Sequence, residues 1–206
     1  MITLALDAAL WTSSVTLIED GVESLHRESA QGSAGEALAE LIADVLAEAG
    51  IAPASLGLIA VTIGPGSYTG VRGALAVARG LGLASGCPVI GVTVGEAMGD
   101  AVAAESLGRP LWTFSGAKRG ALLTMEAGET VRMVEPGDIP RPPFPVAVAG
   151  DAAIAAMGVM AARGDDVLLT SARQPSGFSI ARIAERRLRG EIPPRDLAPL
   201  YIDAYV

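Results

Sequence analysis

The stretch that decides the fold is residues 2–27, which read ITLALDAALWTSSVTLIEDGVESLHR. Its three apolar runs, at 2–6, 13–18 and 22–27, have the length of strands. Asp20-Gly21, between the second run and the third, is a strong β-hairpin signal. The segment therefore predicts a three-stranded antiparallel meander at the start of the chain.

After the meander the hydrophobic pattern alternates between helix and strand. Apolar residues at helical spacing predict a first long helix over 36–49, which ends before Gly50. Strands alternating with helices indicate parallel pairing with right-handed crossovers. The elements predicted next are a strand at 58–63, a Gly/Ala-rich helix at 68–84, a strand at 89–92 and a helix at 96–104.

The same plan starts again near Arg109, because residues 4–21 overlay residues 111–128 and both segments end in a hairpin turn. We therefore predict two similar lobes, an N-terminal lobe at 1–108 and a smaller, divergent C-terminal lobe at 109–206. By analogy, two lobes that each begin with a meander indicate the α/β actin-like ATPase (ASKHA, ribonuclease H-like) fold. The second lobe is predicted to contain strands at 131–134, 146–149 and 167–169, helices at 152–162 and 179–189, and a proline-rich loop at 136–145.

The composition argues against direct binding of nucleic acid. The 206 residues carry a net charge of −8, with a pI near 4.7, whereas nucleic-acid binders usually show a basic surface. The single cysteine, Cys87, is typical of a reducing compartment. Prolines and glycines interrupt the longest uncharged stretch, 49–71, which excludes a membrane span there. Because Asp7 interrupts the first apolar run, we expect no signal peptide and a cytoplasmic location.

The sharpest motif is GPGSYTGVR at residues 64–72, between a predicted strand and a predicted helix. Backbone N–H groups at such a place can hold an anion. The spacing matches neither a Walker A loop nor GxGxxG. Two interpretations stay open: a loop that binds phosphate, or a tight turn in which Ser67 or Thr69 caps the helix.

The two long helices of the first lobe carry unusual surface patterns. Small residues let another backbone approach closely, and two rows of them run along the second helix, so we expect one row against the sheet and one toward a partner. The rows are Gly70, Ala74, Ala78 and Gly82, and Gly73, Val77, Gly80 and Ala84.

An acidic stripe runs along the first helix, with Glu36, Glu40, Asp44 and Glu48 four residues apart. Like charges at this spacing oppose the helix, so the stripe is either a solvated face or a surface for a basic partner. Both helices contribute to the predicted partner interface, which comprises Glu36, Glu40, Leu41, Asp44, Gly70, Arg72, Gly73, Ala74, Val77, Ala78 and Leu81.

Residues that could carry out catalysis are few. His26 is the only histidine and has no serine-protease context, while Cys87 is expected to be a small buried hydrophobe. Asp7, Asp100 and Asp151 could meet at a cleft and hold Mg²⁺, as in actin-like phosphotransferases. The turn after Asp7 lacks the glycine common in that class. We therefore predict no catalytic, cofactor or metal site, with a small phosphotransferase or ATPase as the alternative.

Several segments resemble the TsaB (YeaZ) family. They are Leu4-Ala5-Leu6-Asp7, the motif at 64–72, and residues 76–81, 88–92 and 199–202. The resemblance spans the chain and is densest in its first half. The sequence departs from the family at 34–36, where His-Ser-Glu is common, and at 116–118 and 121–123, where Asp-Ala-Arg and Glu-Val-Tyr are common.

The resemblance implies a non-catalytic scaffold. TsaB binds TsaD, the enzyme that transfers a threonylcarbamoyl group to adenosine 37 of ANN-decoding tRNAs, and the ATPase TsaE joins them. The first two helices of TsaB pack on TsaD or on a second copy of TsaB. This implies a docking surface on helices 36–49 and 68–84, contact with tRNA only through the complex, and no membrane. A glycoprotease role is not expected, because His26 alone cannot supply paired metal-binding histidines.

Overall fold

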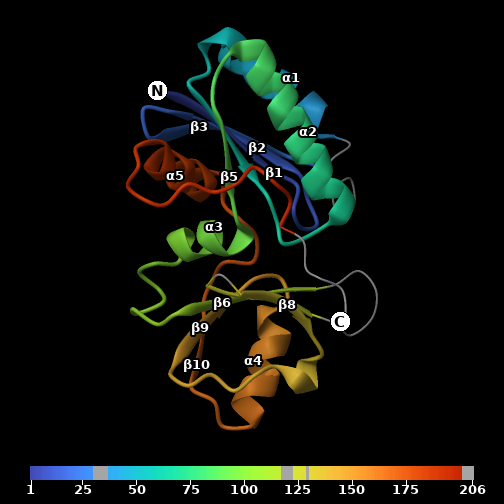
Figure 1. Cartoon of the computed structure of the whole chain (residues 1–206), viewed down its shortest axis with the longest axis vertical. Helices are drawn as coiled ribbons and strands as arrows, with labels where there is room; N and C mark the ends of the chain where they lie inside the picture. The colour runs from blue at the N-terminus through green and yellow to red at the C-terminus, as the bar shows by residue number, and fades with distance from the viewer. Residues whose placement is uncertain (30–36, 117–122, 129, 201–206) are drawn as a thin grey trace. The chain divides into compact units, whose positions relative to one another are not determined.

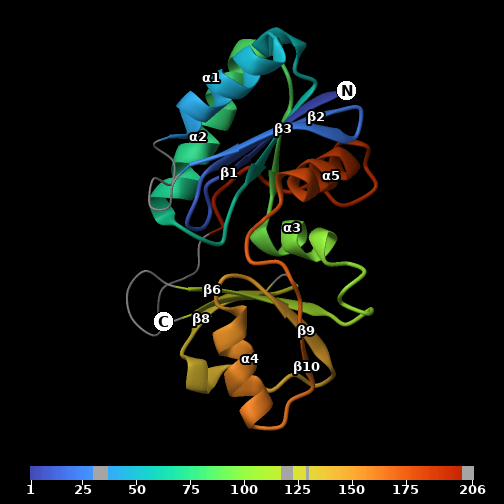
Figure 2. The same ribbon diagram turned by 180° about the vertical axis from the view of Figure 1, so that it is seen from behind.

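The computed structural model describes residues 1–29, 37–116, 123–128 and 130–200. The chain divides into two compact units, the first made of residues 1–94 and 176–200 and the second of residues 95–175. Each unit contains a five-stranded mixed sheet with helices packed on it (Figures 1 and 2). Among the described residues, no helix has both the length and the apolar character needed to cross a membrane.

The sheet of the first unit confirms the predicted meander. Asp20 and Gly21 form its tight turn with φ angles of 49° and 80°, the left-handed conformation that Asp-Gly hairpins favour. β1, β2 and β3 pair antiparallel, and β4 and β5 continue the sheet in parallel to β1, in the order β3-β2-β1-β4-β5. The strands are β1 (Ile2–Asp7), β2 (Ser14–Glu19), β3 (Val22–Glu28), β4 (Leu58–Thr62) and β5 (Val89–Val92).

Helices cover both faces of this sheet. On one face, α1 (Leu38–Ala49) packs on β2 and β3. On the same face, α2 (Tyr68–Ser85) packs on β1, β4 and β5. α5 (Gly177–Leu188) packs on the opposite face, as Figures 1 and 2 show. α1 ends at Gly50 in the left-handed conformation and α2 ends likewise at Gly86, which is the usual role of glycine after a helix.

The position of α5 differs from the sequence prediction, which placed this helix in the lobe at 109–206. β1 and β4 of the first sheet are buried on both faces, and α1 and α2 cover only one of these faces. α5 buries Ile180, Ala181, Ile183 and Ala184, and its contacts with β1, β4 and β5 cover the other face. The first division between the units also falls after Val94, within α3 (Val94–Ala101), and not after residue 108.

The second unit repeats the plan of the first. Its sheet has the order β10-β9-β6-β7-β8, in which β6 takes the place of β1. α4 (Ala153–Ala162) packs on β6, β9 and β10, and a proline-rich segment with the short 3₁₀ helix η2 (Pro136–Asp138) stands where the first unit has α1. This repeat confirms the predicted fold class. The strands are β6 (Leu111–Gly116), β7 (Leu123–Ala127), β8 (Thr130–Val134), β9 (Val146–Ala149) and β10 (Val167–Leu169).

In both units the turn that leads into a helix packs directly on backbone, on the loop after β1 in the first unit and on β6 itself in the second. In the first unit the Ser67 N–H donates to the Ala9 carbonyl at 2.6 Å. A Cβ atom at Gly66 would lie 2.0 Å from that same carbonyl oxygen. In the second unit a Cβ atom at Gly150 would lie 2.1 Å from the carbonyl oxygen of Phe114. Each glycine is thus required by close backbone packing.

We predict that Gly66→Ala destabilises the first unit, because the added methyl group overlaps backbone atoms. Overpacking of this kind typically costs about 1–3 kcal/mol, measured as the free energy of unfolding in urea. Gly80→Ala in α2 is the matched control, because no atom lies within 4 Å of its Cβ position and alanine favours a helix by about 1 kcal/mol over glycine. Equal stability of the two variants would contradict the packing argument.

Candidate partner-binding surface

The sides of α1 and α2 that point away from the sheet expose small residues. Ala39, Ala43 and Ala47 are exposed on α1, and Ala76, Gly80 and Ala84 are exposed on α2. We call these six residues the alanine face. In each helix they recur every four residues, so they form one row along the helix. Two neighbouring helices with such rows are a surface that another helix can approach closely.

An ion pair shows how α1 is turned. Glu48 pairs with Arg27 on the edge strand β3, so this side of α1 faces the edge of the sheet. At about 100° per residue, Ala47 is turned by about 100° and Ala43 by about 140° around the helix from Glu48, away from that edge. α1 and α2 lie side by side on one face of the sheet and contact each other (Figure 1).

The other row of small residues on α2 packs inward. Ala74 and Ala78 have no exposed surface, Gly70 and Gly82 are buried, and a Cβ atom at Gly82 would lie 2.4 Å from the Val89 side chain. Gly70, Ala74 and Ala78 were predicted in the partner interface. Because all three are buried, a partner cannot contact the side chains of Ala74 and Ala78 or pack on Gly70.

The remaining predicted interface residues are accessible where the structure describes them. Glu40, Asp44 and Arg72 are exposed, and Leu41, Gly73, Val77 and Leu81 are partly exposed. Glu36 lies outside the described residues. The alanines of α1 were missed by the sequence analysis, although their spacing of four residues at 39, 43 and 47 was a readable signal.

The first turn of α2 adds an aromatic anchor to this surface. The Tyr68 side chain is 61% exposed, and the Arg72 guanidinium lies 3.7 Å from the centroid of its ring and donates to its hydroxyl. Tyrosine and arginine are enriched among residues that dominate binding energy at interfaces. Further along α2, Leu83 is 88% exposed and adds apolar area to the same helix.

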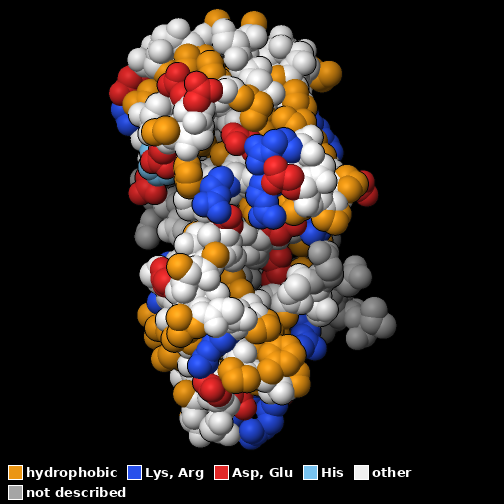
Figure 3. Space-filling model, turned by 90° about the vertical axis from the view of Figure 1, so that its left-hand side faces the viewer, with side chains coloured by type: hydrophobic (Ala, Val, Ile, Leu, Met, Phe, Trp, Pro, Cys, Tyr) orange, Lys and Arg blue, Asp and Glu red, His pale blue; other side chains and the backbone are white. Residues whose placement is uncertain are grey.

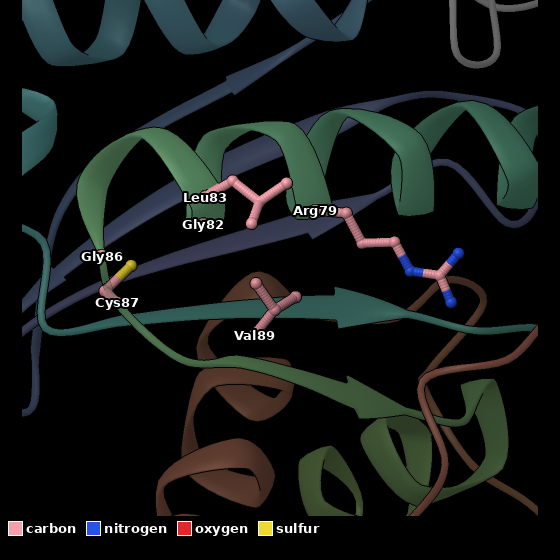
Figure 4. Close-up of a pocket in the computed structure, with 6 residues that line it drawn as sticks. All are labelled: Arg79, Gly82, Leu83, Gly86, Cys87 and Val89. Atoms are coloured by element: carbon pink, nitrogen blue, oxygen red, sulfur yellow. The ribbon is translucent and has the colours of Figure 1, made fainter.

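A groove of about 520 Å³ lies beside the C-terminal half of α2. Figure 4 shows Leu83 of α2 and Val89 of β5 pointing toward each other there. Cys87 was expected to be buried but is partly exposed, with its sulfur 3.1 Å from Ser85 Oγ. The lining is mainly apolar and holds one basic side chain, which suits contact with an apolar segment. The residues are Arg79, Gly82, Leu83, Gly86, Cys87 and Val89.

The motif at 64–72 is a helix-capping turn. The Gly70 N–H donates to Ser67 Oγ at 3.3 Å, so Ser67 is the N-cap of α2. The Ser67 N–H is also used, since it donates to the Ala9 carbonyl. Of the two interpretations left open by the sequence, the geometry supports the capping turn, because these N–H groups are bonded within the protein.

The candidate chemical residues have structural partners. The Asp7 side chain is 2% exposed and accepts hydrogen bonds from Thr62 Oγ1 at 2.5 Å and from the Ala9 N–H at 3.0 Å. Asp151, in the second unit, accepts from the Gly116 N–H at 2.9 Å, and the His26 ring bonds Thr16 Oγ1 at 2.8 Å. Within the described ranges, no three histidine, cysteine or acidic side chains gather as a metal site would require.

Burial dominates the electrostatics of Asp7. Loss of hydration raises the pKa of its carboxyl to about 6, although the bonds from Thr62 and Ala9 act in the opposite direction. The folded pKa then exceeds the unfolded value of 3.8, so the folded state holds the proton more tightly. The contribution of Asp7 to stability is therefore present at low pH and is lost as the pH rises through about 6.

We predict that Asp7→Asn stabilises the protein above pH 6, because the neutral amide keeps an acceptor oxygen and avoids burying a charge. Each pKa unit is worth about 1.4 kcal/mol, so the gain in the free energy of unfolding should be on the order of 3 kcal/mol near pH 7.5. Urea unfolding of both proteins at several pH values measures it. The gain should shrink as the pH falls from 6 to 4, and a constant difference would contradict burial of the charge.

Comparisons with known proteins identify the family and the fold of the chain. The sequence model of the family TsaD, tRNA N6-adenosine threonylcarbamoyltransferase, matches residues 26–140, more than half of the chain. A curated relative from Escherichia coli K12, tRNA threonylcarbamoyladenosine biosynthesis protein TsaB, is 34% identical over 90 residues. This alignment covers 44% of the chain and 39% of the relative's own length. The chain therefore matches about two fifths of that protein.

Solved structures show the likeness of fold. YeaZ from Pseudomonas aeruginosa superimposes with a TM-score of 0.77 over 98% of this chain and 99% of that one, at 24% identity. The ROK hexokinase from Thermus thermophilus superimposes with a TM-score of 0.51 at 13% identity, over 92% of this chain and all of that one. The hexokinase belongs to the actin-like class, so the fold predicted from the sequence is confirmed.

Proposed function

We propose, from the premise that the chain belongs to the TsaD family and within it to the TsaB (YeaZ) proteins, that it is a non-catalytic scaffold and activator of a TsaD-like transferase. The reaction served is the threonylcarbamoylation of adenosine 37 in ANN-decoding tRNA. A TsaE-like ATPase joins the complex, which acts in the cytoplasm. A second copy of the chain takes the place of the transferase when the protein is alone.

The exposed alanine face is the observation that carries this proposal. Ala43 belongs to its row on α1 and Ala76 to its row on α2, and the two helices adjoin each other. Small side chains cost little conformational entropy when they are buried, and they allow close helix packing. The face adjoins the exposed Tyr68 and Leu83, so a partner helix would bury apolar area there. This arrangement supports docking through α1 and α2.

The acidic stripe beside the face would steer the partner. Glu40 and Asp44 are exposed on α1, and neighbouring like charges attract a basic surface over a distance. Such charges set orientation and association rate more than affinity. A docking surface on the partner should therefore be apolar at its centre and basic at one side.

Basic side chains are not arranged for RNA. Figure 3 shows described arginine side chains gathering at the height of α5 with acidic side chains among them. Arg189 pairs with Glu185 and Glu191, and Arg186 also pairs with Glu191. With a net charge of −8 for the chain, these paired arginines give little of the phosphate neutralisation on which RNA affinity depends. This supports contact with tRNA only through the complex.

We predict that Ala43→Arg and Ala76→Arg each weaken binding of the TsaD-like protein from the same cell. The large side chain prevents close approach, and overpacking worth about 1–3 kcal/mol corresponds to about 5- to 150-fold in affinity. Calorimetry measures the dissociation constant. Ala155→Arg, at an exposed alanine of α4, is the matched control and should bind like the wild type.

The charge contribution separates from the packing contribution in the same assay. Glu40→Lys with Asp44→Lys should weaken association strongly at low salt and little at high salt, because salt screens exposed charges. The arginine variants of the alanine face should stay weak at every salt concentration. Folded variants of both kinds that bind like the wild type would place the interface elsewhere.

We also predict that the isolated chain modifies no tRNA, binds tRNA negligibly at physiological salt, and binds ATP weakly or not at all. The reasons are the net charge and the burial of the Asp7 carboxylate, whose Oδ1 already accepts from Thr62 and Ala9. Filter binding and calorimetry with Mg-ATP measure these properties. The alternative, a small actin-like phosphotransferase or ATPase, would instead show micromolar ATP affinity that is lost in Asp7→Ala.

A further inference from the structure

Asp7 lies where two parts of the first unit meet. It ends β1, and its carboxylate oxygen Oδ1 accepts both from the Ala9 N–H, in the loop after β1, and from Thr62 Oγ1, at the end of β4. The loop and the strand end are thus held by one oxygen atom. A carboxylate accepts such bonds about twice as strongly as a neutral group.

Ala9 in turn supports the start of α2. Its carbonyl accepts the Ser67 N–H at 2.6 Å, and Gly66 lies directly against the same oxygen. Ser67 is the N-cap whose Oγ accepts from Gly70. A continuous series of contacts therefore leads from the Asp7 carboxylate through Ala9 and Ser67 to the first turn of α2, which carries the exposed Tyr68.

We propose that Asp7 is a positioning residue for the partner-binding surface, holding Ala9 in place and through Ala9 the first turn of α2. The proposal rests on the proposed function only in naming α2 as part of the docking surface. The proposal assigns a role to Asp7, a buried acid with no described metal neighbour. That role depends on the ionised form of its carboxyl group.

Among the described residues, the groups that shift the pKa of Asp7 are uncharged. β4 brings Thr62, and the loop brings Ala8 and Ala9. On β2, Ser14 is the strand partner of Asp7. On β3, Glu28 is the strand partner of Ser14, and it is exposed. α5 also packs on β1, and its Glu185 accepts a hydrogen bond from Thr3 Oγ1. The arginines of α2 face outward and are exposed.

Protonation of Asp7 therefore has two opposite effects. It relieves the burial of a charge, which raises the stability of the fold, and it weakens the acceptor that holds Ala9, which loosens the start of α2. Asp7→Asn imitates the protonated state, because an amide oxygen accepts as a neutral group does. A residue with only a structural role would change stability and binding in the same direction.

The first measurement needs no partner. In two-dimensional NMR spectra of the isolated wild-type chain, the amide signals of Ala9 and Ser67 should shift with a midpoint near pH 6. In Asp7→Asn these signals should not titrate and should stay at the low-pH positions of the wild type. Ser14→Ala is the control and should titrate like the wild type. Signals of Ser67 that do not move with pH in the wild type would overturn the proposal.

The second measurement uses the TsaD-like protein. Its affinity for the wild type should fall by about fivefold from pH 7.5 to pH 5, as expected for weakening one bond to a charged group. Asp7→Asn should show the weak affinity at both pH values, corrected for the pH dependence of Ser14→Ala. If Asp7→Asn binds like the wild type at pH 7.5 while Ala76→Arg does not bind, the positioning role is wrong and the docking surface stands. If Ala76→Arg also binds normally, the proposed docking surface fails, and the positioning role fails with it.

Discussion

The first unit is organised by a sheet that is apolar on both faces. β1 and β4 are almost fully buried along their length, so both faces must be covered. The chain supplies α1 and α2 for one face directly, but it has to return from the second unit to supply α5 for the other. Once α1 and α2 are held by their inner sides, their outer sides are left to solvent or to a partner. The surface proposed for docking is thus a consequence of how the sheet is covered.

Aromatic residues make up only 4% of the chain. This scarcity explains why small residues on α2 serve both in packing on the sheet and on the outer side of the helix. Inside, Ala74 and Ala78 let the helix lie close to the sheet. Outside, Ala76 and Gly80 leave room for another helix. A protein with large core side chains would keep its helices farther from the sheet, and an outer row of alanines would then differ clearly from the inner row. Here the two rows are chemically alike.

This likeness marks the limit of what could be predicted. The Asp20-Gly21 turn and the helical spacing before Gly50 are local signals, and they were sufficient for the meander, the first helices and the repeated plan of the second unit. The choice of the outward row on α2 depends on where the sheet lies, which no local pattern records. The same holds for α5, whose apolar stripe fits either sheet equally well on sequence grounds and is placed by a contact between distant segments.

Asp7 is an acid whose described hydrogen bonds lie within the fold. Its position, at the end of the first strand of an actin-like unit, is one where a carboxylate could meet a ligand, yet the side chain is 2% exposed and both its described bonds are internal. Burying a charge lowers the stability of a fold. Stabilising substitutions that remove such a charge are readily available to a protein sequence. An acid at this place is therefore expected only if its ionised form does something that a neutral group does less well. The hydrogen bond to the Ala9 N–H is such a task, because Ala9 supports the turn from which α2 begins. The stability that this acid costs and the accuracy with which it places α2 are then two effects of the same charge.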